Sequence, residues 1–204
     1  MAVKDAHQGA AFSTLEDDIR LRKPKALERW LESEKEKIEY YKMLQYFFFK
    51  QWRELKEYAN KKGINIIGDI PIYVSADSAD LWTNPKQFYV DKDIKPIDVA
   101  GCPPDAFTAD GQLWGNPVYN WEYHKKTKYE WWKNRIGHCF KIYDVIRIDH
   151  FRGFDEFYCV PFGSENAKKG EWRKGPGLDL FKALKNEFGE LPIIAEDLGF
   201  LTDS

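Results

Sequence analysis

The sequence predicts an α/β protein whose strands pair in parallel, and three observations support this class. Short apolar runs end in an acidic residue at Asp69, Asp149 and Glu196. These runs are continuously apolar, as in parallel strands that are covered on both faces. Segments with helical spacing alternate with the runs along the chain. Acids at the ends of such strands lie at the mouth of the sheet, where α/β folds bind their ligands.

The first third of the chain is predicted to be mainly helical. Residues 24–62 carry apolar side chains at intervals of three or four, and we expect two helices that break near Ser33. Pro24 suits the first position of a helix, and Gly63 follows the last turn as a typical helix exit. A buried strand is predicted next, over residues 64–70.

The segment 71–122 lacks a regular pattern and is rich in proline and glycine. A loop of this length is rare in a compact domain unless it is functional. We therefore expect an inserted subdomain over the mouth of the sheet, with a few short strands of its own. The remaining elements are predicted to be a helix at 123–141, a strand at 143–149, a loop, a helix near 178–188 and a strand at 191–196.

Three strands cannot close a barrel, which needs about eight. The last residues, Leu201–Ser204, also carry a helix N-cap signal with no helix after it. The whole of 1–204 is therefore expected to be one partial catalytic domain of a larger protein.

The overall composition argues against several functional classes. Lys and Arg total 31 against 33 Asp and Glu, and a net charge of −2 is unlike that of nucleic-acid-binding domains. No run is apolar enough to span a bilayer, and the first residues lack the apolar core of a signal peptide. The three cysteines match no metal or redox spacing. We expect a cytoplasmic protein without a nucleic-acid or membrane partner, and the oligomeric state stays open.

The acids at the strand ends have the arrangement that sugar chemistry requires. Arg147 and Asp149 are two residues apart on a strand, so both side chains face the same side. A guanidinium stabilises an ionised carboxylate, and an ionised carboxylate is needed for attack on an anomeric carbon. Glu196 follows an apolar run, and burial favours the protonated form that a general acid needs. Neighbouring strands lie about 4.8 Å apart, which suits the roughly 5 Å between the two acids of a retaining glycosidase.

The same acids have alternative interpretations. A single strand-end carboxylate often caps the next helix or pairs with an arginine in a purely structural role, and Asp197 is expected to act as such a cap or as a support for the site. Three carboxylates at successive strand ends can also hold Mg²⁺, as in enolase-type barrels. Arg147 would place a fixed positive charge in that metal site, and no Lys-x-Lys at a strand end would supply the base.

Several stretches resemble one known family. Residues 147–153 (Arg-Ile-Asp-His-Phe-Arg-Gly) and 195–199 (Ala-Glu-Asp-Leu-Gly) resemble motifs of the 4-α-glucanotransferases. This is the amylomaltase or disproportionating-enzyme family, glycoside hydrolase family 77 of the α-amylase clan. Similar stretches recur in register at 68–74, 77–82, 101–107 and 111–117. The resemblance implies that the chain supplies about strands three to five of a (β/α)8 TIM barrel.

The resemblance also implies an activity and a set of site residues. The activity is transfer of α-1,4-glucan segments between maltooligosaccharides or starch-type glucans, by a retaining double displacement without metal or cofactor. Asp149 is implied as the nucleophile, Glu196 as the acid/base, and Arg147 as the residue that orients Asp149. The implied substrate-binding residues are Asp69, Asp105, Phe107, Gln112, Trp114 and His150.

Two departures from the family pattern leave other outcomes open. Ala106 stands where many members carry an aromatic residue, and the family's third carboxylate, in a His-Asp-Asn stretch, has no counterpart in this sequence. One alternative is therefore a catalytically inactive glucan-binding or structural fragment of such an enzyme. A Mg-dependent enolase-type barrel enzyme is the more distant alternative.

Overall fold

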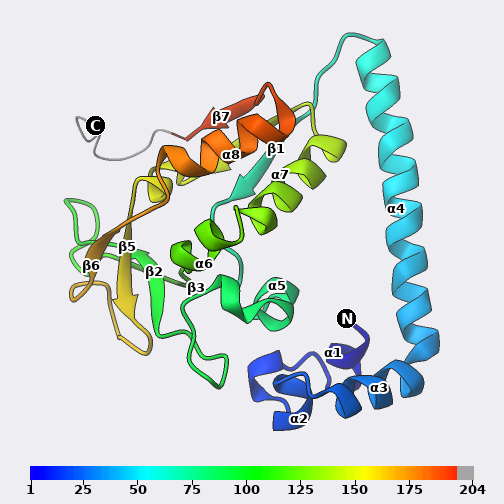
Figure 1. Cartoon of the computed structure of the whole chain (residues 1–204), viewed down its shortest axis with the longest axis horizontal. Helices are drawn as coiled ribbons and strands as arrows, with labels where there is room; N and C mark the ends of the chain where they lie inside the picture. Colours follow the sequence, from blue (N-terminus) through cyan, green and yellow to red (C-terminus); the bar gives the residue numbers. More distant parts are fainter. Residues whose placement is uncertain (197–204) are drawn as a thin grey trace.

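The computed structural model describes residues 1–196, and its centre is a small parallel sheet (Figure 1). The sheet contains β1 (Ile67–Pro71), β4 (Val145–Asp149) and β7 (Ile193–Ala195) in the order β1-β4-β7. These are the three parallel strands that the sequence predicted, each somewhat shorter than expected. The predictions for Asp197 and for the N-cap signal at 201–204 lie outside the described residues.

Two helices cover one face of this sheet and build its core. α7 (Glu130–Ile142) and α8 (Leu178–Phe188) lie side by side across the strands (Figure 1). The buried side chains at this interface come from both helices and from β4, and they include Trp132, Ile136, Ile146, Ile148, Leu180 and Leu184. Burial alternates along β1 and β4 and is low in β7, so within residues 1–196 the sheet is covered mainly on one face and not on both, as the apolar runs had predicted.

A second, antiparallel sheet has the strand order β3-β2-β5-β6. β2 (Asp98–Cys102) and β3 (Gln112–Pro117) come from the segment expected to be inserted, together with α5 (Ala79–Thr83). β5 (Glu156–Pro161) and β6 (Glu171–Lys174) come from the region after β4, for which the prediction of a loop was wrong. The apolar run 157–160 in β5 is buried because it packs beside β2.

The remaining elements frame these sheets. α6 (Trp121–Lys126) precedes α7, and the predicted helix at 123–141 is therefore two helices. The N-terminal part contains α1 (Ala2–Ala6), α2 (Asp17–Arg20), α3 (Pro24–Ser33) and α4 (Lys35–Lys61), which confirms the break near Ser33. Short 3-10 turns are η1 (Phe12–Thr14), η2 (Pro85–Gln87) and η3 (Phe151–Phe154). No helix within residues 1–196 is both long enough and apolar enough to cross a membrane.

The long helix α4 stands apart from the sheets over most of its length (Figure 1). Tyr41 near its start donates to the Asp5 carboxylate of α1, and its last turns contact the chain before β4. Trp52 Nε1 donates to the Ile142 carbonyl at 2.8 Å, and Lys56 pairs with Asp144 at 3.0 Å. Asn60 Nδ2 also donates to Asp144 at 2.8 Å. Desolvation opposes ionisation of Asp144, but hydrogen bonds from the chain before β1 and from α4 outweigh it and lower the pKa.

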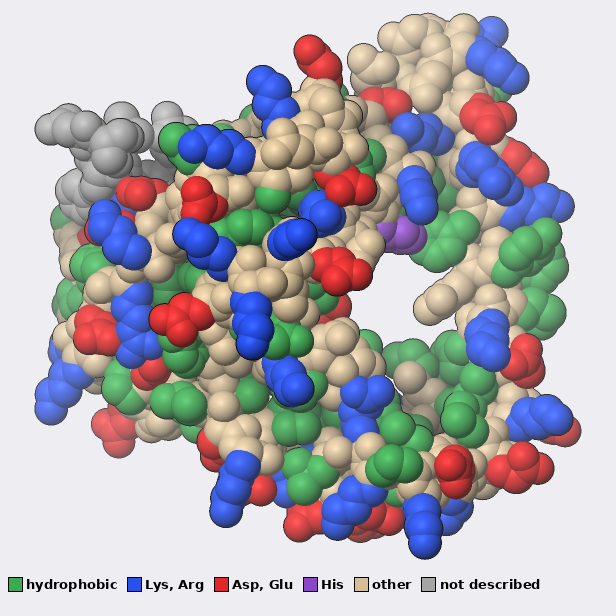
Figure 2. All heavy atoms as spheres, viewed as in Figure 1, with side chains coloured by type: hydrophobic (Ala, Val, Ile, Leu, Met, Phe, Trp, Pro, Cys, Tyr) green, Lys and Arg blue, Asp and Glu red, His purple; other side chains and the backbone are tan. Residues whose placement is uncertain are grey.

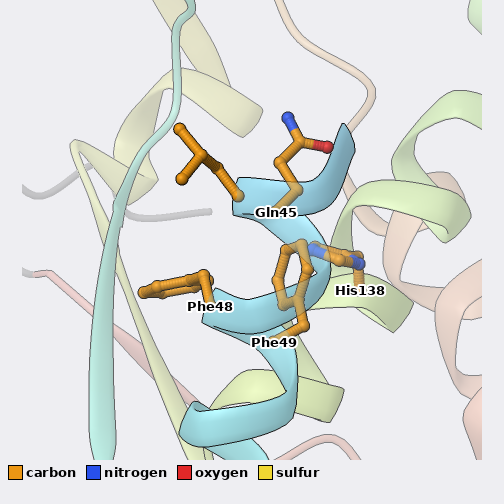
Figure 3. Close-up of a pocket in the computed structure, with 5 residues that line it drawn as sticks. Gln45, Phe48, Phe49 and His138 are labelled. Atoms are coloured by element: carbon orange, nitrogen blue, oxygen red, sulfur yellow. The ribbon is translucent and has the colours of Figure 1, made fainter. Parts of the chain in front are cut away.

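Beyond these turns, a hollow separates α4 from the rest of the molecule (Figure 2). A cavity of about 510 Å³ lies between α4 and α7. The side chains that line the cavity are shown in Figure 3, and they are Leu44, Gln45, Phe48, Phe49 and His138. Phe49 meets the His138 ring at a centroid distance of 5.2 Å. No residue of α4 is buried. Of the apolar residues whose spacing predicted this helix, Leu44, Phe48 and Leu55 are therefore exposed in the described chain, whereas Trp52 is partly buried.

Candidate active site

The strand register places two carboxylates on either side of one arginine. Asp69 lies directly opposite Arg147 in the β1–β4 pair, and Asp149 is two residues further along β4. Arg147 Nη1 donates to both carboxylate oxygens of Asp69 at 2.8 Å each, and Nη2 donates to Asp149 Oδ1 at 3.1 Å. The hydrogen bond to Asp69, supported by Asp149, raises the pKa of the guanidinium in spite of its partial desolvation. Arg147 is therefore a permanent cation between two acids.

The third acid, Glu196, is held at the end of β7 by two hydrogen bonds. Its backbone N–H donates to the Ile148 carbonyl at 3.2 Å, and its Oε2 accepts the backbone N–H of His150 at 3.0 Å. Ile148 pairs with Ala195 in the register, so the next positions, Asp149 and Glu196, lie beside each other at the same edge. The sequence pattern indicated that the acids share this edge, but it gave no sign of the His150 amide contact.

His150 turns the chain away from the sheet directly after β4. Its imidazole contacts the Trp114 ring edge-on at a centroid distance of 4.8 Å, and it contacts the Tyr73 ring at 6.2 Å. Burial lowers the pKa of His150, although the charges of Glu196 and Asp149 oppose the shift. The imidazole is therefore mainly uncharged at neutral pH.

The residues from the inserted segment fall into two groups. Trp114 reaches the site through His150, and Trp114 Nε1 donates to Gln112 Oε1 at 3.0 Å. Asp105 instead accepts from the backbone N–H groups of Thr108 at 2.7 Å and Phe107 at 2.8 Å, and these bonds lower its pKa. The Phe107 side chain is 96% exposed. The structure thus places Trp114 against His150 with Gln112 bonded to Trp114, and it places Asp105 and Phe107 in a separate exposed turn.

Sequence reasoning missed two residues that support the site. Arg135 on α7 donates to the carbonyls of Pro71 at 2.5 Å and Ile72 at 2.8 Å, which fixes the chain where it leaves β1. Nothing in the sequence marks this arginine. Tyr73 is buried, stacks on Tyr119 at 6.0 Å, and has no hydrogen-bond partner for its hydroxyl within residues 1–196. Burial raises its pKa. The sequence signal that could have identified Tyr73 was its position four residues after the strand-end acid Asp69.

The arrangement weighs against a shared metal ion. The Arg147 guanidinium lies between Asp69 and Asp149, so a positive charge already occupies the space between these carboxylates. Within the described part of the chain, no cluster of three or more His, Cys, Asp or Glu side chains is arranged to hold a metal. The group of charges is instead suited to keeping an anionic carboxylate oriented beside a second acid.

Comparison with known proteins relates these features to a family. The family model described as 4-alpha-glucanotransferase, glycoside hydrolase family 77, matches residues 1–204. The 4-alpha-glucanotransferase of Clostridium butyricum is 50% identical over 100% of the chain, and that of Thermus thermophilus is 40% identical over 99%. These alignments cover 42% and 40% of the two relatives, so the chain spans less than half of their length.

Solved structures show the same likeness. An amylomaltase from Streptococcus agalactiae in complex with acarbose is 48% identical and superposes with a TM-score of 0.97. The match covers 100% of this chain and 41% of that one. An amylomaltase from Corynebacterium glutamicum, at 20% identity and a TM-score of 0.76 over 99% of this chain and 26% of its own, shares the fold. These likenesses confirm the predicted α/β class and the partial barrel.

Proposed function

The chain belongs to the 4-alpha-glucanotransferase family, glycoside hydrolase family 77, and from this premise we propose that it acts in glucan transfer at the carboxyl edge of the β1-β4-β7 sheet. The reaction moves α-1,4-linked segments between maltooligosaccharides or starch-type glucans. The observation that carries the proposal is Arg147, which binds Asp69 and Asp149 together beside Glu196. One acid is thereby oriented as an anion next to a second that can exchange a proton.

The proposed reaction is a double displacement with retention at the anomeric carbon. Asp149 attacks the anomeric carbon while the bond between that carbon and the leaving glucan oxygen breaks. Glu196 gives its proton to the leaving oxygen. An acceptor hydroxyl then gives its proton to Glu196 and attacks the anomeric carbon, which releases Asp149. Arg147 bonds Oδ1 of Asp149, so Oδ2 is the oxygen assigned to the attack. These steps need neither a metal nor an organic cofactor.

Substrate contacts are proposed for the surroundings of this pair. Trp114 is 37% exposed and can contact a sugar ring while it keeps its edge-to-face contact with His150. Gln112 beside it offers amide groups to sugar hydroxyls, and Asp69 has a largely exposed carboxylate. Transfer is favoured over hydrolysis when a sugar acceptor displaces water. The exposed Phe107 in its turn with Asp105 is the proposed contact for such an acceptor.

Disproportionation of maltotriose tests this proposal. The assay uses the 204-residue chain and, in parallel, the complete product of its gene, with Asp149→Asn as the matched control. Production of glucose and longer maltooligosaccharides, lost in the variant, supports the proposal. Binding of maltooligosaccharides without turnover in either form would instead favour an inactive glucan-binding or structural role. Loss of turnover on chelation would favour the metal-dependent alternative.

A further inference from the structure

The backbone of His150 has a conformation that residues with a side chain rarely adopt. Its φ of 55° and ψ of 45° lie in the left-handed region, although it is not a glycine. Such a conformation is unfavourable for a residue with a Cβ and persists where the surroundings impose it. The turn directly follows β4 and begins η3.

This turn leads the chain away from β7 and leaves one amide facing the proposed acid/base. The N–H of His150 donates to Oε2 of Glu196 at 3.0 Å, and the N–H of Glu196 donates to the Ile148 carbonyl at 3.2 Å. The end of β4 therefore holds both the main chain and the carboxylate of Glu196. A hydrogen bond from a backbone N–H to a carboxylate is charge-assisted and directional.

The side chain of His150 is clamped by three neighbours. The Trp114 ring makes an edge-to-face contact with the imidazole at a centroid distance of 4.8 Å. The Tyr73 ring, which follows β1, lies at a centroid distance of 6.2 Å from the imidazole. A Cβ at Gly153 would come within 3.1 Å of His150 Cδ2, so the missing side chain at residue 153 makes room for the ring. These contacts supply the packing that holds the left-handed turn in place.

We propose that His150 is a positioning residue, which orients the Glu196 carboxylate through its backbone N–H while its imidazole locks the turn against Trp114 and Tyr73. The inference rests on the proposed function, because it assigns the hydrogen bond from His150 to Glu196 to the proton-transfer step of that reaction. It differs from a role in sugar binding, in which the imidazole would contact the substrate and the backbone conformation would be incidental.

Two pairs of substrates separate these roles. Maltotriose as donor and acceptor needs Glu196 twice, to protonate the leaving oxygen and to accept the proton of the acceptor hydroxyl. With α-maltosyl fluoride, the C–F bond breaks as Asp149 bonds to the anomeric carbon, and fluoride leaves without a proton. Azide then forms a C–N bond as the ester to Asp149 breaks, and it has no proton to lose. The fluoride and azide pair therefore bypasses Glu196.

The variant His150→Ala loses the clamped ring and disfavours the left-handed turn. We expect its kcat with maltotriose to fall about 100-fold, because a small displacement of a catalytic group has an effect of this size. Its KM should change less than about 3-fold, and its rate with fluoride and azide less than about 5-fold. His150→Asn should recover kcat to within about 10-fold of the unchanged protein, because asparagine tolerates the left-handed region.

Glu196→Gln is the reference variant, and it should show the same split between the two substrate pairs. Circular dichroism melts confirm that each variant is folded. Equal losses of His150→Ala with both pairs, or a loss confined to KM, would overturn the positioning role in favour of a sugar contact. An Asn variant no better than Ala would also overturn it. Inactivity of the unchanged protein with both pairs would reject the proposed function, and this inference with it.

Discussion

The carboxyl edge of the parallel sheet and the apolar face of α4 follow opposite rules. At the edge, Arg147 and three acids contact one another or the ends of neighbouring strands. Along α4, large apolar side chains such as Phe48 and Leu44 are about half exposed. The polar groups are partnered within the described residues, and the apolar ones are not buried by them. The contrast shows that strand register brings most of a polar site together, whereas a helix face needs a matching surface.

The difference follows from how each region is held. Adjacent strands fix the spacing of Asp69, Arg147 and Glu196 through backbone hydrogen bonds. α4 is held by a few side-chain contacts, from Trp52, Lys56 and Asn60 to the chain before β4 and from Tyr41 to Asp5 of α1. Substitutions at the edge should therefore change chemistry more than stability, and substitutions on the exposed face of α4 should change little in this chain.

The largest expected effect is on activity, for Arg147→Met. The change removes the cation that orients Asp149, so kcat/KM for maltotriose should fall by about 10²–10³-fold. The melting temperature should shift little, because Arg147 is one-third exposed. Arg147→Lys keeps the charge but loses the simultaneous bonds to both acids, and an intermediate loss is expected. Unchanged turnover in the Met variant would contradict the role of the edge.

The buried His124 lies outside both the sheet edge and α4, and it should make the stability of the fold depend on pH. His124 is fully buried, its Nε2 lies 3.0 Å from the Gln87 carbonyl, and desolvation lowers its pKa to about 4. The unfolded chain takes up this proton near pH 6.5, so the stabilisation is present above that pH and is lost as the pH falls towards 4. The loss should reach about 3 kcal/mol.

Urea unfolding between pH 7 and pH 4 measures this dependence, with His124→Gln as the control. The glutamine keeps a donor but does not titrate, so its unfolding free energy should vary less with pH over this window. Equal pH dependence in both proteins would show that His124 is not the titrating group.

A smaller effect is expected where α4 is attached. Trp52→Phe removes the hydrogen bond to the Ile142 carbonyl while keeping an aromatic ring against Tyr143. The free energy of unfolding should fall by about 1 kcal/mol, the typical net value of one such bond. Chemical denaturation gives the difference, and no change would mean that this attachment does not stabilise the fold.

The smallest effect is expected on the exposed face of α4. Phe48→Ser should change the free energy of unfolding of the 204-residue chain by less than about 0.5 kcal/mol, because Phe48 is 51% exposed. Ile136→Ala on α7 is the matched control, and its buried side chain should cost about 2–5 kcal/mol. A large loss for Phe48→Ser would show that this face is packed in solution, and the contrast between the two regions would fail.

The sequence by itself determined the parallel strands, the two helices α3 and α4 on either side of the break near Ser33, and the clustering of Asp69, Arg147, Asp149 and Glu196. Each of these follows from local rules: apolar runs, helical spacing, and the two-residue alternation that puts Arg147 and Asp149 on one side. The family motifs lie at the same strand ends, and their implied fold is confirmed by the solved relative.

Only the tertiary structure decided the rest. β5 was missed because its burial depends on pairing with β2, which lies before α6 and α7 in the chain. β6 was missed because it is largely exposed and is held by its pairing with β5. The left-handed turn at His150 depends on Trp114 and Tyr73, which are remote in sequence. The exposure of α4 depends on which surfaces reach it. Local patterns specify an element and its apolar face, but contacts between distant segments decide what that face meets and where a single amide points.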